Sequence, residues 1–387
     1  MRIIKVKGKE LIVEGSEVPK LKESFIGEFK EGKIFLKPEE ALYLMDMRKW
    51  ICMEGNKVID FNELASKFLK EQPKLFARYN TYRDWKDRGL FIKFFKKVRF
   101  GKLEKVKYPS TQMKFPKIDA EAGYFPFDMI SVIEKGRKYF KLFADFWFGQ
   151  LGVYKKHERG KTLKLDIFET LFLLKHCGLK VTNLETREDL DFNSLLALTK
   201  NFELFKALYE VYEDWRLRGF IVKTGYKFGS HFRIYFPGVS PVRKDRWIHS
   251  KHVLHVFPKY ERMLISEWAR AIRVAHSVRK TFILGIPGMK EEDYKEIELD
   301  FITFHRKNGK VVTPKTGKPS FCVLAVSEDE FIGGAELASA LRIAEEVGLN
   351  LLLAVTERES GVTYYLTRQI ELPGSRYQYY EIEWFQP

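Results

Sequence analysis

An internal repeat constrains the fold of this chain more than any other feature of its sequence. Three segments occur twice in the same order: EALYLMDM, DFNEL and YRDWKDRGLFIK begin at Glu40, Asp60 and Tyr82, and ETLFLLKH, DFNSL and YEDWRLRGFIVK begin at Glu169, Asp191 and Tyr212. In both copies apolar residues recur at helical spacing, and Gly89 or Gly219 stands where a helix would stop before a strand. The sequence therefore predicts a duplicated α/β unit.

A fainter repeat lies in the C-terminal half. The first copy runs from HVLHVF to TFILGI (252–286), and the second runs from CVLAVS to LLLAV (322–355). Each copy reads as a strand, a loop, an amphipathic helix and an apolar strand. The first copy ends its helix in the basic run SVRK (277–280), whereas the second ends its helix in EVGL (346–349).

These repeats predict a mixed α/β fold in which two N-terminal units precede two C-terminal units, the last of them degenerate. After the repeated segment the second copy runs into the alternating stretch KTGYKFGSHFRIYFPG, while the first enters a basic, proline-interrupted stretch. The expected organisation is a first N-terminal unit (1–93), a linker or decayed remnant (94–127), a second N-terminal unit (128–222), a nuclease-like domain (223–310) and a degenerate structural domain (311–387).

The charge balance indicates the partner. Lysine and arginine total 68 against 52 aspartates and glutamates, a net charge of +16, which favours a polyanion, either nucleic acid or an anionic membrane. No run approaches the roughly 18 apolar residues of a spanning helix, and the opening MRIIKVKGKELIVEG lacks a signal peptide's apolar core. Cys52, Cys177 and Cys322 are expected to be buried thiols in a reducing compartment. We therefore expect a cytoplasmic nucleic-acid-binding protein with no membrane partner.

Five of the eight histidines fall between positions 231 and 276. Zinc is one interpretation, because His249, His252 and His255 are three residues apart. On a strand, however, side chains three apart point to opposite faces, and no cysteine or carboxylate pattern completes a site. We expect no metal and no cofactor.

A helix is expected from position 266 to position 279. On a helical wheel its apolar residues share one side, which predicts the core face: Trp268, Ala271, Ile272, Val274, Ala275 and Val278. Arg273, Ser277 and Lys280 fall on the opposite side. The apolar strand TFILGI follows directly, so Lys280 is expected at a fixed helix–strand junction.

Four motifs in this region resemble one known family. KTGYKFG, then HFRIY, then HSKHVLHV and finally RVAHSVRK are similar, in this order, to the catalytic domain of archaeal-type tRNA-splicing endonucleases. The resemblance covers residues 223–286 and departs from the family at His252, where an aromatic residue is usual. The N-terminal units resemble the family's N-terminal domain through DW-x-x-RG, and the last unit resembles its noncatalytic partner domain.

The resemblance implies a catalytic set and a substrate. Tyr235 corresponds to the general base, His249 to the general acid and Lys280 to the group that stabilises the transition state. Arg273 and Arg306 correspond to two arginines that hold a bulged base between them. The implied activity is metal-independent cleavage of precursor tRNA at bulge–helix–bulge sites, which leaves 2′,3′-cyclic phosphate and 5′-hydroxyl ends.

Two cut sites require two active sites, and this chain carries one complete set. Leu349 stands where the last unit would need the lysine, so we expect a homodimer. The acidic loop Glu328-Asp329-Glu330 is expected to contact the other protomer. Separately, the basic residues Lys155, Lys156 and Lys161 form either a solvated turn or a loop that contacts RNA phosphates.

Two alternatives stay open from the sequence. One is a noncatalytic RNA-binding or assembly subunit of such an enzyme, although the Tyr235, His249 and Lys280 set argues against it. The other is a metal-dependent DNA nuclease, which would need clustered carboxylates. The region offers only Asp245, Glu261 and Glu267, at unconvincing spacing.

Overall fold

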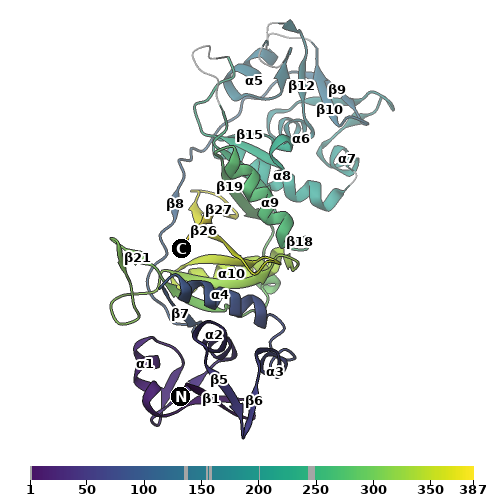
Figure 1. Cartoon of the computed structure of the whole chain (residues 1–387). Coiled ribbons are helices and arrows are strands. Elements are labelled where there is room, and N and C mark those ends of the chain that lie inside the picture. The colour runs from purple at the N-terminus through teal and green to yellow at the C-terminus, as the bar shows by residue number, and fades with distance from the viewer. Residues whose placement is uncertain (1, 135–137, 154–155, 157–158, 200, 243–248) are drawn as a thin grey trace.

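A computed structural model describes residues 2–134, 138–153, 156, 159–199, 201–242 and 249–387 of the chain. The molecule is elongated, with one small unit at each end and a long central sheet between them (Figure 1). No helix among the described residues is long and apolar enough to cross a membrane. Cys52, Cys177 and Cys322 are free and buried, as predicted.

The first end unit is a six-stranded sheet in the order β3-β4-β2-β1-β5-β6. Its strands are β1 (Ile3–Lys7), β2 (Glu10–Val13), β3 (Glu28–Lys30), β4 (Lys33–Leu36), β5 (Ile51–Glu54) and β6 (Lys57–Ile59). Its helices are η1 (Gly15–Glu17), α1 (Val18–Glu23), α2 (Pro38–Arg48), α3 (Phe61–Ser66) and α4 (Leu75–Asp87).

The second end unit has the corresponding strand order, β11-β12-β10-β9-β13-β14. Its strands are β9 (Glu121–Phe125), β10 (Ile130–Ile133), β11 (Gln150–Leu151), β12 (Leu163–Leu165), β13 (Lys180–Asn183) and β14 (Asp189–Leu190). Its helices are α5 (Lys138–Phe146), α6 (Ile167–Phe172), the π-helical turn η3 (Leu173–Cys177), α7 (Phe192–Ala197) and α8 (Phe202–Leu217). The topologies match, while an origin by duplication stays an interpretation.

The repeated residues explain why the two units fold alike. Asp60 caps α3 by accepting the Glu63 N–H at 2.7 Å, and Asp191 caps α7 by accepting the Ser194 N–H at 2.7 Å. A buried glutamate on α2 and another on α6 each accept a glycine N–H at 2.8 Å. The same side chains thus meet the same backbone groups in both units.

The central sheet joins both C-terminal repeats. Its main order is β15-β16-β17-β19-β27-β26-β25-β23-β20-β7, and β8 pairs with β26 beside this path. The strands are β15 (Ile221–Thr224), β16 (Phe232–Tyr235), β17 (His252–Val256), β19 (Thr281–Ile286), β27 (Gln378–Phe385), β26 (Val362–Glu371), β25 (Asn350–Thr356), β23 (Phe321–Ser327), β20 (Phe301–Phe304), β7 (Phe91–Phe94) and β8 (Val106–Lys107). The remaining elements are η4 (Tyr226–Phe228), α9 (Ile265–Ser277), η5 (Glu291–Asp293), α10 (Gly334–Val347) and the short pairs β18 (Arg262–Leu264) with β24 (Phe331–Gly333) and β21 (Arg306–Lys307) with β22 (Lys310–Val311).

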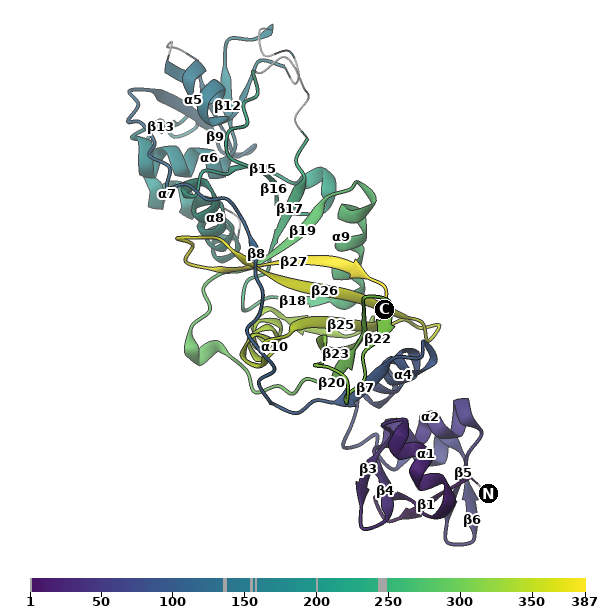
Figure 2. The same ribbon diagram turned by 90° about the vertical axis from the view of Figure 1, so that its left-hand side faces the viewer.

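Each face of this sheet buries apolar side chains against different helices. One face packs against the core of the second end unit near β16 and β17 and against the core of the first near β23 and β25. The opposite face packs against α9 and α10. The segment between β7 and β9 (residues 95–120), here called the strap, runs in extended form across the central sheet (Figure 2). The Tyr108 hydroxyl of the strap donates to the Glu381 carboxylate at 2.7 Å.

The mixed α/β class is confirmed, but part of the predicted core of α9 is wrong. Trp268, Ile272 and Ala275 are buried, whereas Val274 is 39% exposed and Val278 is 45% exposed. On the wheel these two valines lie at the edge of the apolar side, and no element covers that edge in the described chain. The sheet also runs without a break across the expected boundary at 310/311, so the domain limits remain a prediction.

Candidate active site

Strand directions bring the three predicted catalytic residues to one end of the central sheet. β16 is antiparallel to β17, and β17 is parallel to β19. The end of β16 therefore lies beside the starts of β17 and β19. Tyr235 is the last residue of β16, His249 precedes β17 and Lys280 immediately precedes β19.

Lys280 is held against the segment that carries His249. Its ammonium donates to the Ser250 hydroxyl at 2.9 Å and also to the Ser250 carbonyl. The same ammonium lies 4.7 Å from the centre of the Phe228 ring in the KTGYKFG motif. Partial burial lowers the pKa of Lys280, and the nearby Arg233 guanidinium lowers it further.

Tyr235 and His249 differ in their exposure. Tyr235 is 6% exposed, and its ring centroid lies 4.8 Å from that of Trp147, just after α5 in the second end unit. His249 is exposed to solvent. The candidate site thus combines an accessible imidazole with a tyrosine fixed between the central sheet and the neighbouring unit.

A specific helix ending positions Lys280. The N–H groups of Arg279 and Lys280 donate to the carbonyls of His276 and Ala275, both at 2.9 Å, and Arg279 has a φ of 55°. This pattern is a Schellman motif with Arg279 at its left-handed position. The helix ending therefore fixes where the lysine backbone leaves α9.

The last unit repeats this ending without the amine. Gly348 and Leu349 donate to Glu345 and Ala344, both at 3.0 Å. Leu349 is 7% exposed and belongs to the core between α9 and α10. The position equivalent to Lys280 is thus used for packing.

The two predicted base-holding arginines lie over different parts of the sheet. Arg273 is exposed and lies near Tyr365 of β26; burial raises the pKa of Tyr365, and the guanidinium opposes that shift. Arg306 follows β20, and β20 lies three strands away from β26 in the sheet. The usual spacing of strands makes that separation about 14 Å. It donates to the Arg88 carbonyl at 3.2 Å. Within one chain, the structure does not bring Arg273 and Arg306 together.

Of the three predicted RNA-contacting lysines, two can be placed. Lys156 and Lys161 are exposed in the connection between β11 and β12, on the same end unit as Trp147. Lys155 lies outside the described residues. The described pair is therefore accessible to a large ligand.

The acidic loop expected at a dimer contact binds cations of its own chain. The Asp329 carboxylate accepts a hydrogen bond from the Arg358 guanidinium at 2.7 Å, and the Glu328 carboxylate accepts one from the Arg358 backbone N–H at 2.7 Å. Glu330 pairs with Lys74 of the first end unit. Any contact with a second protomer would therefore compete with these ion pairs or add to them.

The sequence did not predict the role of Lys223 in the KTG motif. Its ammonium is buried and lies 2.5 Å from Glu169 and 2.9 Å from the Gly149 carbonyl. Burial lowers the pKa of the Lys223 ammonium. Burial and the nearby charge of Glu169 raise the pKa of the Asp166 carboxyl to about 7. This pair ties the second end unit to the sheet. The one available signal was a lysine directly after the apolar pair Ile221-Val222.

The histidines spaced by three residues do not converge. The His252 ring stacks on Phe236 with centroids 4.8 Å apart, whereas the His255 ring packs at a tilt against His231 with centroids 4.4 Å apart. Their apolar neighbours on β17 alternate between the two cores of the sheet, as the strand periodicity predicts. These rings thus take part in packing on opposite faces.

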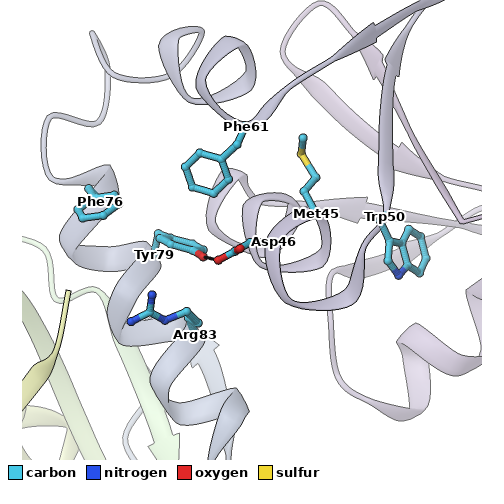
Figure 3. Close-up of a pocket in the computed structure, with 7 residues that line it drawn as sticks. All are labelled: Met45, Asp46, Trp50, Phe61, Phe76, Tyr79 and Arg83. Carbon is cyan, nitrogen blue, oxygen red and sulfur yellow. Dashed lines mark hydrogen bonds between the residues drawn. The ribbon is translucent and has the colours of Figure 1, made fainter. Parts of the chain in front are cut away.

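A separate pocket of about 430 Å³ lies in the first end unit (Figure 3). It is lined by Met45, Asp46, Trp50, Phe61, Phe76, Tyr79 and Arg83. In the second unit the corresponding position is occupied by an ion-pair cluster, in which Lys175 and His176 bind Glu213 at 2.9 and 2.6 Å. The two end units therefore differ in charge and packing at this place.

Comparisons with known proteins agree with this geometry. The family of the catalytic C-terminal domain of tRNA intron endonucleases matches residues 205–299, which include all three predicted catalytic residues. The tRNA-splicing endonuclease of Methanococcoides burtonii is 25% identical over 326 residues, 70% of this chain and 92% of the relative. That of Thermococcus gammatolerans is 33% identical over 158 residues, 40% of this chain and 88% of the relative.

A third relative, the tRNA-splicing endonuclease of Pyrococcus furiosus, is 36% identical over 129 residues, which span 33% of this chain and 70% of the relative. The predicted resemblance is thus confirmed. With the motifs in order, one sheet end that gathers them and relatives matched over most of their length, the chain belongs to the archaeal-type tRNA-splicing endonucleases.

Proposed function

We propose that this endonuclease excises introns from precursor tRNA by cutting bulge–helix–bulge RNA without a metal ion. The observation that carries the proposal is the contact between Lys280 and Ser250, which fixes an ammonium beside the segment of His249, at the sheet end where Tyr235 lies. A base, an acid and a cation are the groups that cleavage by a ribose hydroxyl requires.

In the proposed reaction the 2′-oxygen of the nucleotide before the cut attacks the adjacent phosphorus. The phenolate form of Tyr235, which has given its own proton to solvent, accepts the proton of the 2′-hydroxyl, and His249 donates a proton to the departing 5′-oxygen. The bond between phosphorus and the 2′-oxygen forms as the bond to the 5′-oxygen breaks. The products are a 2′,3′-cyclic phosphate and a 5′-hydroxyl.

Lys280 offsets the negative charge that builds up on the phosphorane oxygens. Its ammonium donates two hydrogen bonds to Ser250, which favour the charged form and hold it in place. Each positioned acid or base is expected to contribute roughly 10²–10⁴-fold to the rate.

The substrate proposal follows from RNA shape. Paired RNA hides its base edges, whereas bulged nucleotides can stack on arginine planes. Exposed Arg273, two helical turns before Lys280 on α9, suits this role, while Arg306 would have to act elsewhere on the RNA or from a second protomer. Lys156 and Lys161 are proposed to contact phosphates through the β11–β12 connection, and Lys155, which lies outside the described residues, is proposed to do the same.

We further propose a homodimer, because a bulge–helix–bulge has two cut sites and the last unit has Leu349 in place of a second lysine. Glu328, Asp329 and Glu330 remain the proposed contact of the acidic loop with the other protomer. In that case Asp329 pairs both with Arg358, whose side chain is 77% exposed, and with a cation of the partner.

Cleavage in excess EDTA tests the function. Wild-type protein is expected to cut a bulge–helix–bulge RNA at both sites and leave cyclic-phosphate ends, whereas His249→Ala is expected to lose at least about 10²-fold in rate. His276→Ala is the matched control, since His276 is also exposed but lies in the last turn of α9. A wild-type enzyme that needs a divalent metal, or an active His249→Ala variant, would contradict the proposal.

A further inference from the structure

Arg279 has a backbone conformation that its side chain does not favour. Its φ is 55°, in the left-handed region that glycine adopts at no steric cost. The hydrogen bonds of this helix ending come from backbone groups alone, so a glycine would make them equally well. The fold therefore gives no reason for an arginine here.

The equivalent helix ending in the last unit supports this. There the left-handed residue is Gly348, with a φ of 79°. A Cβ atom at Gly348 would come within 2.2 Å of the Gly101 carbonyl of the strap, so only glycine fits. Arg279 is exposed and free of that restriction. This difference allows a side chain at position 279 but does not explain why it is charged.

The surroundings of Arg279 are positively charged. It directly precedes Lys280, and Arg233 lies close enough to lower the pKa of Lys280. The charges of Lys251 and Lys280 both lie close enough to His252 to lower its pKa. Among the described residues, no carboxylate pairs with any of these four cations. Like charges gathered in this way repel one another unless an anion binds between them.

We propose that Arg279 binds a phosphate of the RNA strand next to the phosphate that is cut. The inference rests on the proposed function and adds a second anion contact at the same site. A guanidinium suits this role because it can donate two parallel hydrogen bonds to one phosphate. The left-handed backbone is then retained for substrate binding at a cost in stability.

The proposal predicts opposite effects of one substitution on stability and binding. Arg279→Gly relieves the backbone and is expected to raise the melting temperature by about 1–3 °C. The same change is expected to weaken RNA binding about tenfold at moderate salt and to reduce the slope of log affinity against log salt by about 0.7–0.9, the loss of one phosphate contact. Arg279→Lys should keep most of the salt slope without the gain in melting temperature.

Lys49→Gly is the matched control. Lys49 is an exposed cation with a φ of 56° at the end of α2, in the first end unit. It should gain melting temperature as Arg279→Gly does, with RNA binding unchanged. This pair separates relief of the backbone from loss of a phosphate contact.

The experiment measures binding and cleavage separately. Binding is followed with a bulge–helix–bulge RNA that carries 2′-deoxynucleotides at both cut sites, and cleavage with the all-ribose RNA. If Arg279→Gly binds with wild-type affinity and salt slope while the wild type cleaves normally, the inference fails and the proposed function stands. If the wild type binds this RNA but does not cleave the all-ribose form, the proposed function fails instead.

Discussion

At the scale of single residues, buried ionisable groups fix the parts of the site. Lys223 binds Glu169 in a buried pair that joins the second end unit to the central sheet. The repeat places Lys93 at the corresponding position of the first unit, where it is exposed and has no carboxylate partner among the described residues. One sequence position thus carries a buried, ion-paired cation in one unit and, in the other, a partly exposed cation that lies 5.3 Å from the centre of the Phe25 ring.

Lys223→Ala is expected to destabilise the protein by about 3–5 kcal/mol, because it leaves the buried Glu169 carboxylate unpaired. Lys93→Ala is expected to cost less than about 1 kcal/mol, since an exposed lysine contributes little. Chemical denaturation of both variants measures the difference. Equal losses would show that the buried pair adds nothing to stability.

The buried pair His231 and His255 predicts an effect of pH on stability. Burial lowers the pKa of His255 to about 3 and that of His231 to about 4, both from 6.5. Below pH 6.5 the unfolded chain takes up protons that the folded chain does not bind until these lower values, so the free energy of unfolding falls as the pH falls through this window. Buried carboxyls such as Glu40, whose pKa rises to about 7, act in the opposite direction.

His255→Phe isolates the histidine effect. The His255 ring nitrogens have no hydrogen-bond partner, so phenylalanine loses no bond and keeps the stacking on Phe282. The difference in stability between variant and wild type should grow by up to about 1.4 kcal/mol per pH unit as the pH falls from 6.5 to 4. A difference that does not change with pH would contradict the assignment of His255 as a neutral buried ring.

At the scale of elements, local signals were predictable and long-range pairing was not. The glycine stops and the junction at Lys280 depend on neighbouring residues, and the sequence predicts them. The contact of Lys280 with Ser250 depends on β17 lying beside β19. The exposure of Val274 and Val278 depends on what covers α9. A single sequence shows neither which strands pair nor which side of a helix is covered.

The strap was predicted only as a linker or remnant. Tyr108 donates to Glu381, a buried residue of β27, at 2.7 Å, which fastens the strap across the sheet. Tyr108→Phe is expected to cost about 1–3 kcal/mol because the carboxylate loses a buried donor. Ser110→Ala, which removes a hydrogen bond of 3.1 Å at the exposed edge, should cost less than about 1 kcal/mol. Equal effects in thermal unfolding would mean that the strap is not fastened by this bond.

At the scale of the whole molecule, the two C-terminal repeats share one sheet. β27 from the end of the chain pairs with β19, and β7 from the first unit pairs with β20. The sequence predicted separate domains in chain order, because pairings between distant segments leave no local pattern. The family and the residues at the sheet end were predictable because their motifs are contiguous.

The proposed dimer belongs to this scale as well. Light scattering of the wild type is expected to give twice the mass of one 45.7 kDa chain. Replacing Glu328, Asp329 and Glu330 by their amides should shift the protein toward monomer, whereas Arg358→Ala should leave the dimer intact. A wild-type monomer, or a dimer unaffected by the triple change, would contradict the proposed contact.

The central claim is that a ribose hydroxyl performs the cut with the help of Tyr235, His249 and Lys280. The most direct measurement replaces the 2′-hydroxyl by hydrogen at one cut site of a bulge–helix–bulge RNA and follows both sites in EDTA. The account predicts that the unmodified site is cut to a cyclic phosphate while the modified site stays intact. Cleavage at the 2′-deoxy site at a comparable rate would contradict it.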